Sequence, residues 1–259
     1  MEYPKASKYP DLDTVYSQCS GPGALKLAEF IADKLDLRPG TRLLDVGTNR
    51  GYQTCFLAKE YGAFVVGIDP GNDRHEKNTS HVEFVMRNAR SLGVQNRVLG
   101  VAVGVPETKF ADASFDAAYS TTTLEMIRGF QGEDRYRECL AEVLRMLRPG
   151  GLFGYGDPMH VDVDIPADLV SAYTTGEGAG PASFAKSFAT LDETVDAFTS
   201  VGFEIVEAGL APDAWPWWDE YCRCGSNEDE ARIIRTDGGR WISFGYVIAR
   251  KAEETGRGR

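Results

Sequence analysis

The sequence predicts a doubly wound α/β fold, and this prediction starts from residues 41–70. Residues 43–46 form a short, mostly apolar run that ends at a polar turn containing glycine, and residues 53–60 have helical character. Residues 63–68 are a second apolar run, rich in valine, and Asp69 follows it. A strand, a tight turn, a helix and a strand within about 30 residues form one βαβ unit, so the two strands are expected to be parallel.

The carboxyl ends of these two strands carry the residues that predict a ligand site. Ligands of open α/β sheets bind beyond those ends, which is where Asp45 and Asp69 fall. Gly47 permits a sharp turn beside a ligand because it has no side chain, and Gly51 lets the next helix start close to the strand. An acid after the second strand is well placed to accept hydrogen bonds from both hydroxyls of a ribose.

The turn itself departs from the Gly-x-Gly-x-x-Gly pattern of dinucleotide-binding proteins. Residues 45–51 read Asp-Val-Gly-Thr-Asn-Arg-Gly, and a carboxylate in front of the first glycine suits an amino group better than a pyrophosphate. This segment resembles the first motif of class I S-adenosylmethionine (SAM) dependent methyltransferases, Asp-x-Gly-x-Gly-x-Gly. Asn49 replaces the middle glycine, and Asn tolerates left-handed backbone better than most residues. The alternative is a structural turn that binds no ligand.

Composition narrows the class of protein and its partners. The 259 residues suit one large α/β domain, and 42% hydrophobic with 26% charged residues is typical of a soluble globular protein. A net charge of −11 argues against a nucleic-acid partner, and no apolar run is long enough for a membrane span. Five scattered cysteines fit reduced thiols. We therefore expect a cytoplasmic protein that binds neither nucleic acid nor membrane.

Residues 1–22 are predicted to form a polar arm with a short helix near residues 11–18. Residues 24–37 follow with the apolar spacing of a helix. In the family that the first motif resembles, this arm and helix fold over the cofactor. The resemblance would place three side chains of the arm beside it: Tyr16, Cys19 and Ser20. The alternative is an ordered surface arm.

The adenine side of the site is expected after the third strand. Residues 78–92 are predicted as a helix and residues 96–103 as that strand. Residues 113–120, which include Ser-Phe-Asp, resemble the fourth strand of the same family. Gly104 stands about where the family often has an acid for the adenine amino group. Backbone groups near Gly104 and Val105, with apolar walls, would therefore hold the adenine.

The segment after the fourth strand passes beside the transferred methyl group in this family. The resemblance therefore places Ser120 and Thr121 at the cofactor, although a threonine there can also serve only as a helix N-cap. Residues 133–147 have helical apolar spacing, and Leu-Arg-Pro-Gly-Gly at 147–151 resembles the stop before the family's fifth strand, predicted at residues 152–155.

Three candidates for proton transfer at the acceptor surround the predicted end of that strand: His160, Asp157 and Tyr155. A neutral imidazole is the usual proton acceptor near pH 7, and each candidate has the alternative of an ordinary loop or packing residue. Residues 157–190 are predicted as a cap insertion over the pocket, with a short helix near residues 166–173. The alternative is an ordinary crossover connection.

The C-terminal part is predicted to complete the sheet. Residues 191–201 read as a helix and residues 202–208 as the sixth strand. By family topology the last strand, residues 241–249, runs antiparallel beside it. Residues 214–221 hold three of the four tryptophans, which either wall an acceptor or pack a loop on the sheet edge. Residues 251–259 are expected to be frayed.

Cys222 and Cys224 are too few for a structural zinc site, so we expect no metal, but their spacing keeps open a thiol or metalloid methyltransferase. The main interpretation is one domain, residues 1–259, with a seven-stranded, mostly parallel sheet and a small cap. It resembles the small-molecule branch related to ubiquinone and menaquinone biosynthesis methyltransferases.

This resemblance implies methyl transfer from SAM to an O, N, S or C atom of a small-molecule acceptor, with a homodimer as one option. The predicted cofactor-binding residues are Asp45, Gly47, Thr48, Asn49, Gly51, Asp69, Pro70, Gly104, Val105, Ser120 and Thr121. Asn49 and Gly104 keep open a SAM-binding homologue that does not methylate. A nucleotide-dependent oxidoreductase is disfavoured by the missing third glycine.

Overall fold

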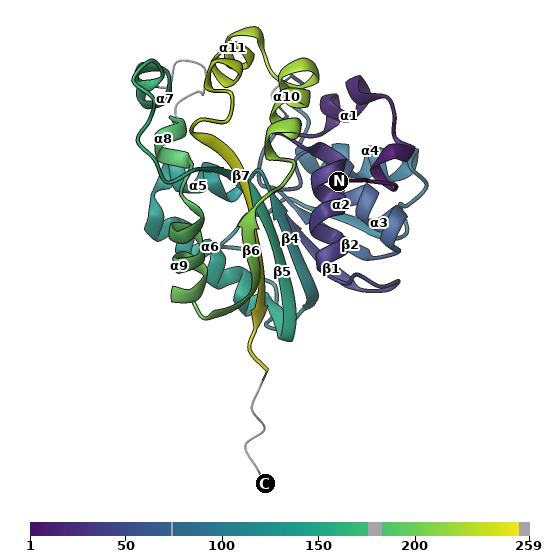
Figure 1. Cartoon of the computed structure of the whole chain (residues 1–259). Coiled ribbons are helices and arrows are strands. Elements are labelled where there is room, and N and C mark those ends of the chain that lie inside the picture. The colour runs from purple at the N-terminus through teal and green to yellow at the C-terminus, as the bar shows by residue number, and fades with distance from the viewer. Residues whose placement is uncertain (74, 176–182, 254–259) are drawn as a thin grey trace.

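The computed structural model describes residues 1–73, 75–175 and 183–253, which form a sheet covered by helices on both faces (Figure 1). The sheet has seven strands in the order β3-β2-β1-β4-β5-β7-β6. The strands are β1 (Arg42–Val46), β2 (Phe64–Ile68), β3 (Val98–Val101), β4 (Phe115–Thr121), β5 (Leu147–His160), β6 (Phe203–Leu210) and β7 (Ile242–Lys251). All neighbouring pairs are parallel except those of β7, which is antiparallel to β5 and β6. This confirms the predicted doubly wound, mostly parallel sheet and its antiparallel last strand.

The helices, like the strands, are numbered in chain order. They are the short 3₁₀ helix η1 (Ala6–Lys8), α1 (Leu12–Gln18), α2 (Ala24–Lys34), α3 (Tyr52–Tyr61), α4 (His81–Ser91), α5 (Leu124–Gln131), α6 (Glu133–Met146), α7 (Val170–Thr175), α8 (Phe184–Ser187), α9 (Leu191–Ser200), α10 (Ala214–Cys224) and α11 (Glu228–Asp237). None of these described helices is long and apolar enough to cross a bilayer.

Alternating side chains of the strands supply two cores, one on each face of the sheet. Leu43 packs in the cluster that includes α2, α3 and α4, whereas its neighbour Leu44 packs in the cluster that includes α6 and α9. Successive side chains of a strand point to opposite faces, so a buried parallel strand reads as a continuous apolar run. The continuous apolar run is the reason that β1 and β2 could be predicted from the sequence.

The fifth strand is longer than the sequence predicts. β5 continues to His160 because it pairs with β7 through Asp157↔Gly245, Pro158↔Phe244 and His160↔Ile242. Asp157 and His160 therefore lie within the strand and not in a loop after it, and that expectation was wrong. The pairing partner is more than 80 residues away in the chain, so local sequence around Pro158 gave no sign of it.

The tryptophan-rich segment is a helix, α10, and not the loop that one interpretation assumed. Pro216 stands in its first turn, where a missing N–H breaks no helical hydrogen bond. α11 and α5 were also not predicted as separate helices. The glycine-containing part of the predicted cap, residues 176–182, and residues 254–259 of the predicted tail lie outside the described residues.

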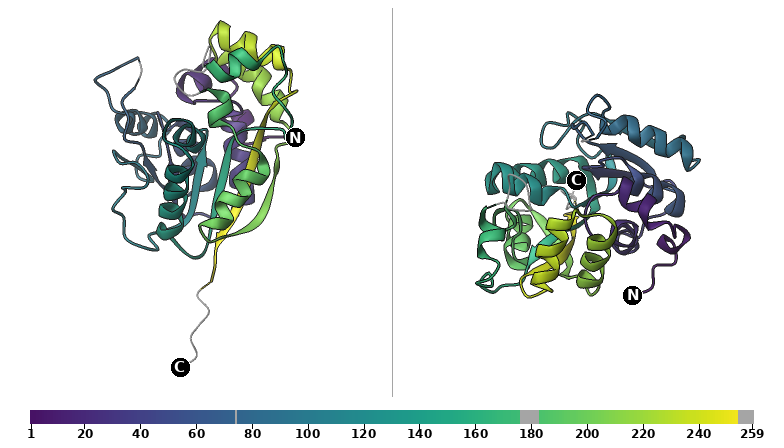
Figure 2. Two further views of the ribbon diagram at one scale, coloured as in Figure 1. Left: turned by 90° about the vertical axis from the view of Figure 1, so that its left-hand side faces the viewer. Right: turned by 90° about the horizontal axis from the view of Figure 1, so that it is seen from above.

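A third apolar cluster joins two stretches that are far apart in the chain. It contains Tyr173 of α7, Phe184 of α8, Trp218 of α10 and Ile234 of α11. These helices lie beyond the sheet at the end where β5 finishes (Figure 1, Figure 2). We call them the cap helices, and we call the third apolar cluster the cap cluster. Because β5 is parallel to β4, they lie on the carboxyl-end side of the parallel strands.

Candidate functional site

Asp69 lies at the carboxyl ends of the strands, and both of its carboxylate oxygens accept hydrogen bonds from the protein. Its Oδ2 accepts a hydrogen bond from the Asn49 backbone N–H at 2.9 Å. Its Oδ1 accepts from the Gly71 N–H and from Nδ1 of His81, both at 2.8 Å. Burial alone would raise the pKa of Asp69, but these hydrogen bonds outweigh it and hold the pKa below its usual value. Asp69 is therefore an ionised acceptor at neutral pH.

Asp45 is the buried member of the acid pair, at 3% exposure. The Thr54 hydroxyl donates to its Oδ2 at 2.5 Å, and Thr48 is hydrogen-bonded to Thr54. Burial raises the pKa of Asp45 to about 7 against the opposing effect of these hydroxyls. The carboxyl is thus tied to the first turn of α3, and its predicted contact with the cofactor stays a prediction.

The turn between β1 and α3 has left-handed backbone at three positions. Gly47, Asn49 and Gly51 have φ of 78°, 49° and 73°. Asn49 therefore adopts a conformation that glycine takes readily and that Asn tolerates better than most residues. A Cβ on Gly47 would collide with the side chain of Thr123, so this turn packs closely against the segment after β4.

Replacing Gly51 with alanine is expected to destabilise the protein by about 1–3 kcal/mol. The new Cβ would lie 2.6 Å from Cγ2 of Val85 and would force a left-handed conformation on a residue with a side chain. Urea unfolding would measure the loss. Gly93→Ala is a matched control, because Gly93 is also left-handed but nothing lies within 4 Å of its added Cβ. Equal losses in the two variants would show that the contact with Val85 contributes nothing.

The structure brings the predicted adenine-side residues together. Gly104 lies against Pro70, since a Cβ on Gly104 would be 3.0 Å from Cγ of that proline. Val105, next in the chain, is buried and belongs to the same apolar cluster as Ile68 at the end of β2. Their contact with a cofactor stays a prediction.

Hydroxyl groups at the end of β4 connect three parts of the chain. Ser120 donates to the Val46 carbonyl at 3.0 Å, and Thr121 donates to Oε1 of Gln53 at 3.1 Å. Thr122, the next residue, donates to the Ser20 carbonyl at 3.1 Å. The end of the N-terminal arm at Ser20 therefore contacts the segment after β4, and its predicted position over the cofactor stays a prediction. Of the three side chains predicted there, Tyr16 instead donates to Glu220 of α10.

Asp157 is fully buried and fixes the segment after β4. Its Oδ1 accepts from the Thr123 N–H at 3.2 Å and its Oδ2 from the Glu125 N–H at 3.0 Å. Burial raises the pKa of both Asp157 and Glu125, and their mutual repulsion raises that of Glu125 further. Glu125 was missed because its partner comes from β5, 32 residues later.

Glu125→Gln is expected to gain stability relative to the wild type as the pH rises from 5 to 8, because burial and the neighbouring Asp157 raise the pKa of the Glu125 carboxyl. A carboxyl whose folded pKa is raised costs stability as pH rises from its unfolded pKa to its folded pKa. The amide removes this cost. Urea unfolding at both pH values would measure it, with the exposed Glu83→Gln as control. A difference between Glu125→Gln and wild type that stays constant with pH would contradict the expected titration.

The other two proton-transfer candidates have different surroundings. Tyr155 is 1% exposed, and its ring packs edge-on against Phe198. Nδ1 of His160 donates to the Val161 carbonyl at 2.8 Å, and its ring stacks on Trp241 at 4.5 Å. His160 thus contacts the base of the cap, whereas Asp157 contacts the segment that packs on Gly47. The catalytic roles of all three stay predictions.

The three tryptophans of residues 214–221 have separate environments. Trp217 packs against Phe244 of the sheet, and Trp218 packs in the cap cluster, where its indole donates to the Ser243 carbonyl. Trp215 is the exposed one and lines a surface cavity of about 810 Å³ together with the N-terminal arm. They therefore do not form one wall, and the packing interpretation accounts for two of them.

The sheet order is that of the methyltransferase fold, and the left-handed turn after β1 and the ionised acid after β2 lie at the carboxyl ends of its strands. Residues 44–154 match the protein family described as "Methyltransferase domain". SAM is the cofactor that this match indicates, and a solved geranyl diphosphate methyltransferase with this fold is a complex with SAM.

The chain is also similar in sequence to curated proteins. It is 31% identical over 195 residues to 24-methylenesterol C-methyltransferase 2 of Oryza sativa subsp. japonica, over 73% of this chain and 49% of that protein. It is 30% identical over 190 residues to the uncharacterized protein YjhP of Escherichia coli (strain K12), over 72% and 66%. The chain thus spans about half the length of the sterol methyltransferase and about two thirds of YjhP.

Solved structures share the fold at lower identity. The [4+2]-cyclase SpnF has a TM-score of 0.72 at 18% identity, over 95% of this chain and 93% of that one. Geranyl diphosphate C-methyltransferase from Streptomyces coelicolor A3(2) has a TM-score of 0.70 at 17% identity, over 88% and 79%. These likenesses concern the fold alone.

The described residues fit SAM by their chemistry. Asp69 is ionised and its side chain is 13% exposed, so it can accept hydrogen bonds from hydroxyls. Gly47 and Gly51 present backbone without side chains at the turn beside it.

Proposed function

We propose that this chain transfers a methyl group from SAM to an O, N, S or C atom of a small-molecule acceptor. The observation that carries the proposal is the ionised Asp69 next to the left-handed turn of residues 47–51, on a sheet of the methyltransferase order. The match of residues 44–154 to the methyltransferase domain supports it.

SAM supplies an electrophilic methyl group when it is bound. In this proposal Asp69 accepts hydrogen bonds from the ribose hydroxyls, and Gly47 allows the backbone to come close to the amino-acid part. Pro70 and Val105 flank the adenine. The departing thioether needs no proton, so the contribution of these residues is to position the reactants and exclude water.

A proton acceptor is needed only if the acceptor atom must lose a proton. Among the three candidates, Asp157 is the one whose carboxylate holds the segment that packs against Gly47. We propose that its first role is to position this segment. His160 would act at the cap side of the acceptor and Tyr155 through its hydroxyl.

The acceptor branch is a narrower proposal. Several curated relatives are named as sterol C-methyltransferases, and two solved relatives as geranyl diphosphate methyltransferases. These names favour methylation of carbon in a sterol or isoprenoid acceptor over the ubiquinone and menaquinone branch suggested by the motifs. Methyl-transfer rates on a panel of isoprenoid, sterol, quinol and amine acceptors would show which of these two acceptor branches the chain prefers.

A homologue that binds SAM without methylating is the second candidate. Its support is Asn49 in the first motif and the similarity to a protein that is described as a [4+2]-cyclase. Calorimetry with SAM and with S-adenosylhomocysteine separates the cases. Binding with product formation on the panel supports methyl transfer, and binding without product on any member favours this second candidate. No binding of either compound would reject both.

The thiol or metalloid alternative lacks such support. Cys222 is buried in the cap cluster, and burial raises the pKa of its thiol to about 11. A thiol with that pKa is almost entirely protonated at neutral pH and is a poor nucleophile.

A further inference from the structure

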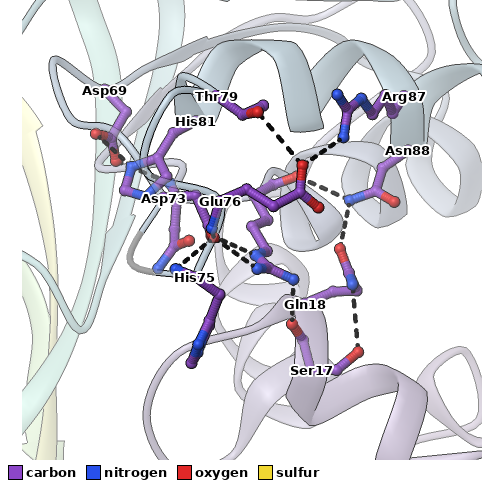
Figure 3. A network of polar contacts seen from close by, with 12 residues as sticks. Ser17, Gln18, Asp69, Asp73, His75, Glu76, Thr79, His81, Arg87 and Asn88 are labelled. Carbon is purple, nitrogen blue, oxygen red and sulfur yellow. Dashed lines mark hydrogen bonds and ion pairs between the residues drawn. The ribbon is translucent and has the colours of Figure 1, made fainter.

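His81 contacts the acid to which the proposed function assigns the ribose, and the sequence did not indicate this contact. It is the first residue of α4, and its Nδ1 lies 2.8 Å from Oδ1 of Asp69 (Figure 3). Because an ionised carboxylate only accepts, Nδ1 must carry the proton in this contact. The side chain of His81 is 16% exposed and that of Asp69 13%, so the pair is partly open to a ligand.

The hydrogen bonds to Asp69 can be counted against what its carboxylate can accept. An ionised carboxylate offers about four lone-pair positions. The N–H groups of Asn49 and Gly71 take one each, and His81 takes a third. A ribose that donates through both hydroxyls needs two positions, so one of the present donors must leave.

The donor that can leave is His81. The Asn49 and Gly71 donors are backbone groups, and both are held in place. Asn49 belongs to the turn after β1. The start of this turn is held by hydrogen bonds from the Gly47 and Thr48 N–H groups to the Ile68 carbonyl. The Gly71 carbonyl accepts from the His81 N–H at 3.1 Å. The imidazole, by contrast, is a side chain that can change rotamer while its backbone stays in α4.

We propose that His81 competes with the ribose diol for Asp69, so that SAM binds only when the imidazole releases the carboxylate. This inference rests on the proposed function and adds a residue that sets the cofactor affinity of the same site.

The competition depends on the hydrogen bond from Nδ1 of His81 to Asp69, because this contact occupies the position that the second ribose hydroxyl needs. The charged groups around the pair are largely paired among themselves. Arg50 of the turn before α3 pairs with Asp73 of the loop, and Arg87 of α4 pairs with Glu76 (Figure 3). His75 of the loop and Glu83 of α4 are exposed. We therefore expect the cofactor to bind more tightly when the imidazole is removed.

Calorimetry of S-adenosylhomocysteine at pH 8 tests this with His81→Ala and His75→Ala. His81→Ala should bind about fivefold more tightly than the wild type, because one hydrogen bond to Asp69 no longer has to be broken. The His75→Ala control should bind as the wild type does. His81→Gln, which keeps a side-chain donor, should bind less tightly than His81→Ala and guards against misfolding of the alanine variant.

A second probe removes one hydroxyl from the ligand. The 2′-deoxy analogue of S-adenosylhomocysteine needs one acceptor position, and Asp69 has one left beside His81. Its affinity should therefore respond little to His81→Ala. Weaker binding of both ligands to His81→Ala would mean that His81 supports the cofactor and would overturn the competition. An unchanged affinity of S-adenosylhomocysteine for His81→Ala would do the same. Absence of binding to the wild type would instead reject the proposed function and this inference with it.

Discussion

Replacing Asp69 with alanine is expected to weaken SAM binding by about 2–4 kcal/mol, because two hydrogen bonds from the ribose hydroxyls would go unreplaced. The carboxylate is ionised and lies at the end of β2 beside the turn after β1. Calorimetry with SAM and with S-adenosylhomocysteine would measure the loss.

Two further variants make this result interpretable. Asp69 also accepts backbone hydrogen bonds from Asn49 and Gly71, so a thermal melt must show that the alanine variant is folded. Asp69→Asn keeps the shape and one acceptor oxygen and should lose less affinity. The exposed Asp36→Ala should bind as the wild type does. Near-unchanged affinity of Asp69→Ala would show that the ribose is held elsewhere.

Asp157→Leu is expected to lower the free energy of unfolding by about 3 kcal/mol, since each unsatisfied buried N–H costs roughly 1–3 kcal/mol. Asp157 accepts from the N–H groups of Thr123 and Glu125, and leucine offers no acceptor to either. Part of the loss is offset because a buried carboxylate, whose pKa burial raises, no longer has to be accommodated. Urea unfolding would give the value.

Asp157→Asn separates positioning from proton transfer. The amide keeps one oxygen acceptor for the start of α5, so its stability should lie between those of the wild type and Asp157→Leu. If positioning is its role, the amide variant should keep most of its methyl-transfer rate on every acceptor. A loss confined to acceptors that must shed a proton would instead identify Asp157 as the base. Wild-type stability of Asp157→Leu would show that the two hydrogen bonds do not matter.

The parts of the site that could be predicted are those fixed within one βαβ unit. Gly47, Gly51 and Asp69 follow from the order strand, turn, helix, strand, because parallel strands place their carboxyl ends together. Asn49 could be accepted in the turn because its side chain tolerates the left-handed backbone that the structure has, at φ 49°.

The parts that could not be predicted depend on pairings distant in the chain. β5 extends to His160 through β7, and this extension carries Asp157 to the start of α5. His81 stands 12 residues after Asp69, with a loop between them whose shape is set by contacts such as Arg50 with Asp73. A histidine at the start of the helix after the second strand was the one sequence signal available, and no local pattern ties it to the acid.

The sequence by itself determined the order of the strands, the tight turn after β1 and the acid that follows β2, because apolar periodicity and glycine conformation act over a few residues. The tertiary structure alone decided which donors already occupy that acid, how far β5 runs and which helices form the cap. Those outcomes come from side chains and strands that meet only after the sheet has assembled, so no short stretch of the chain encodes them.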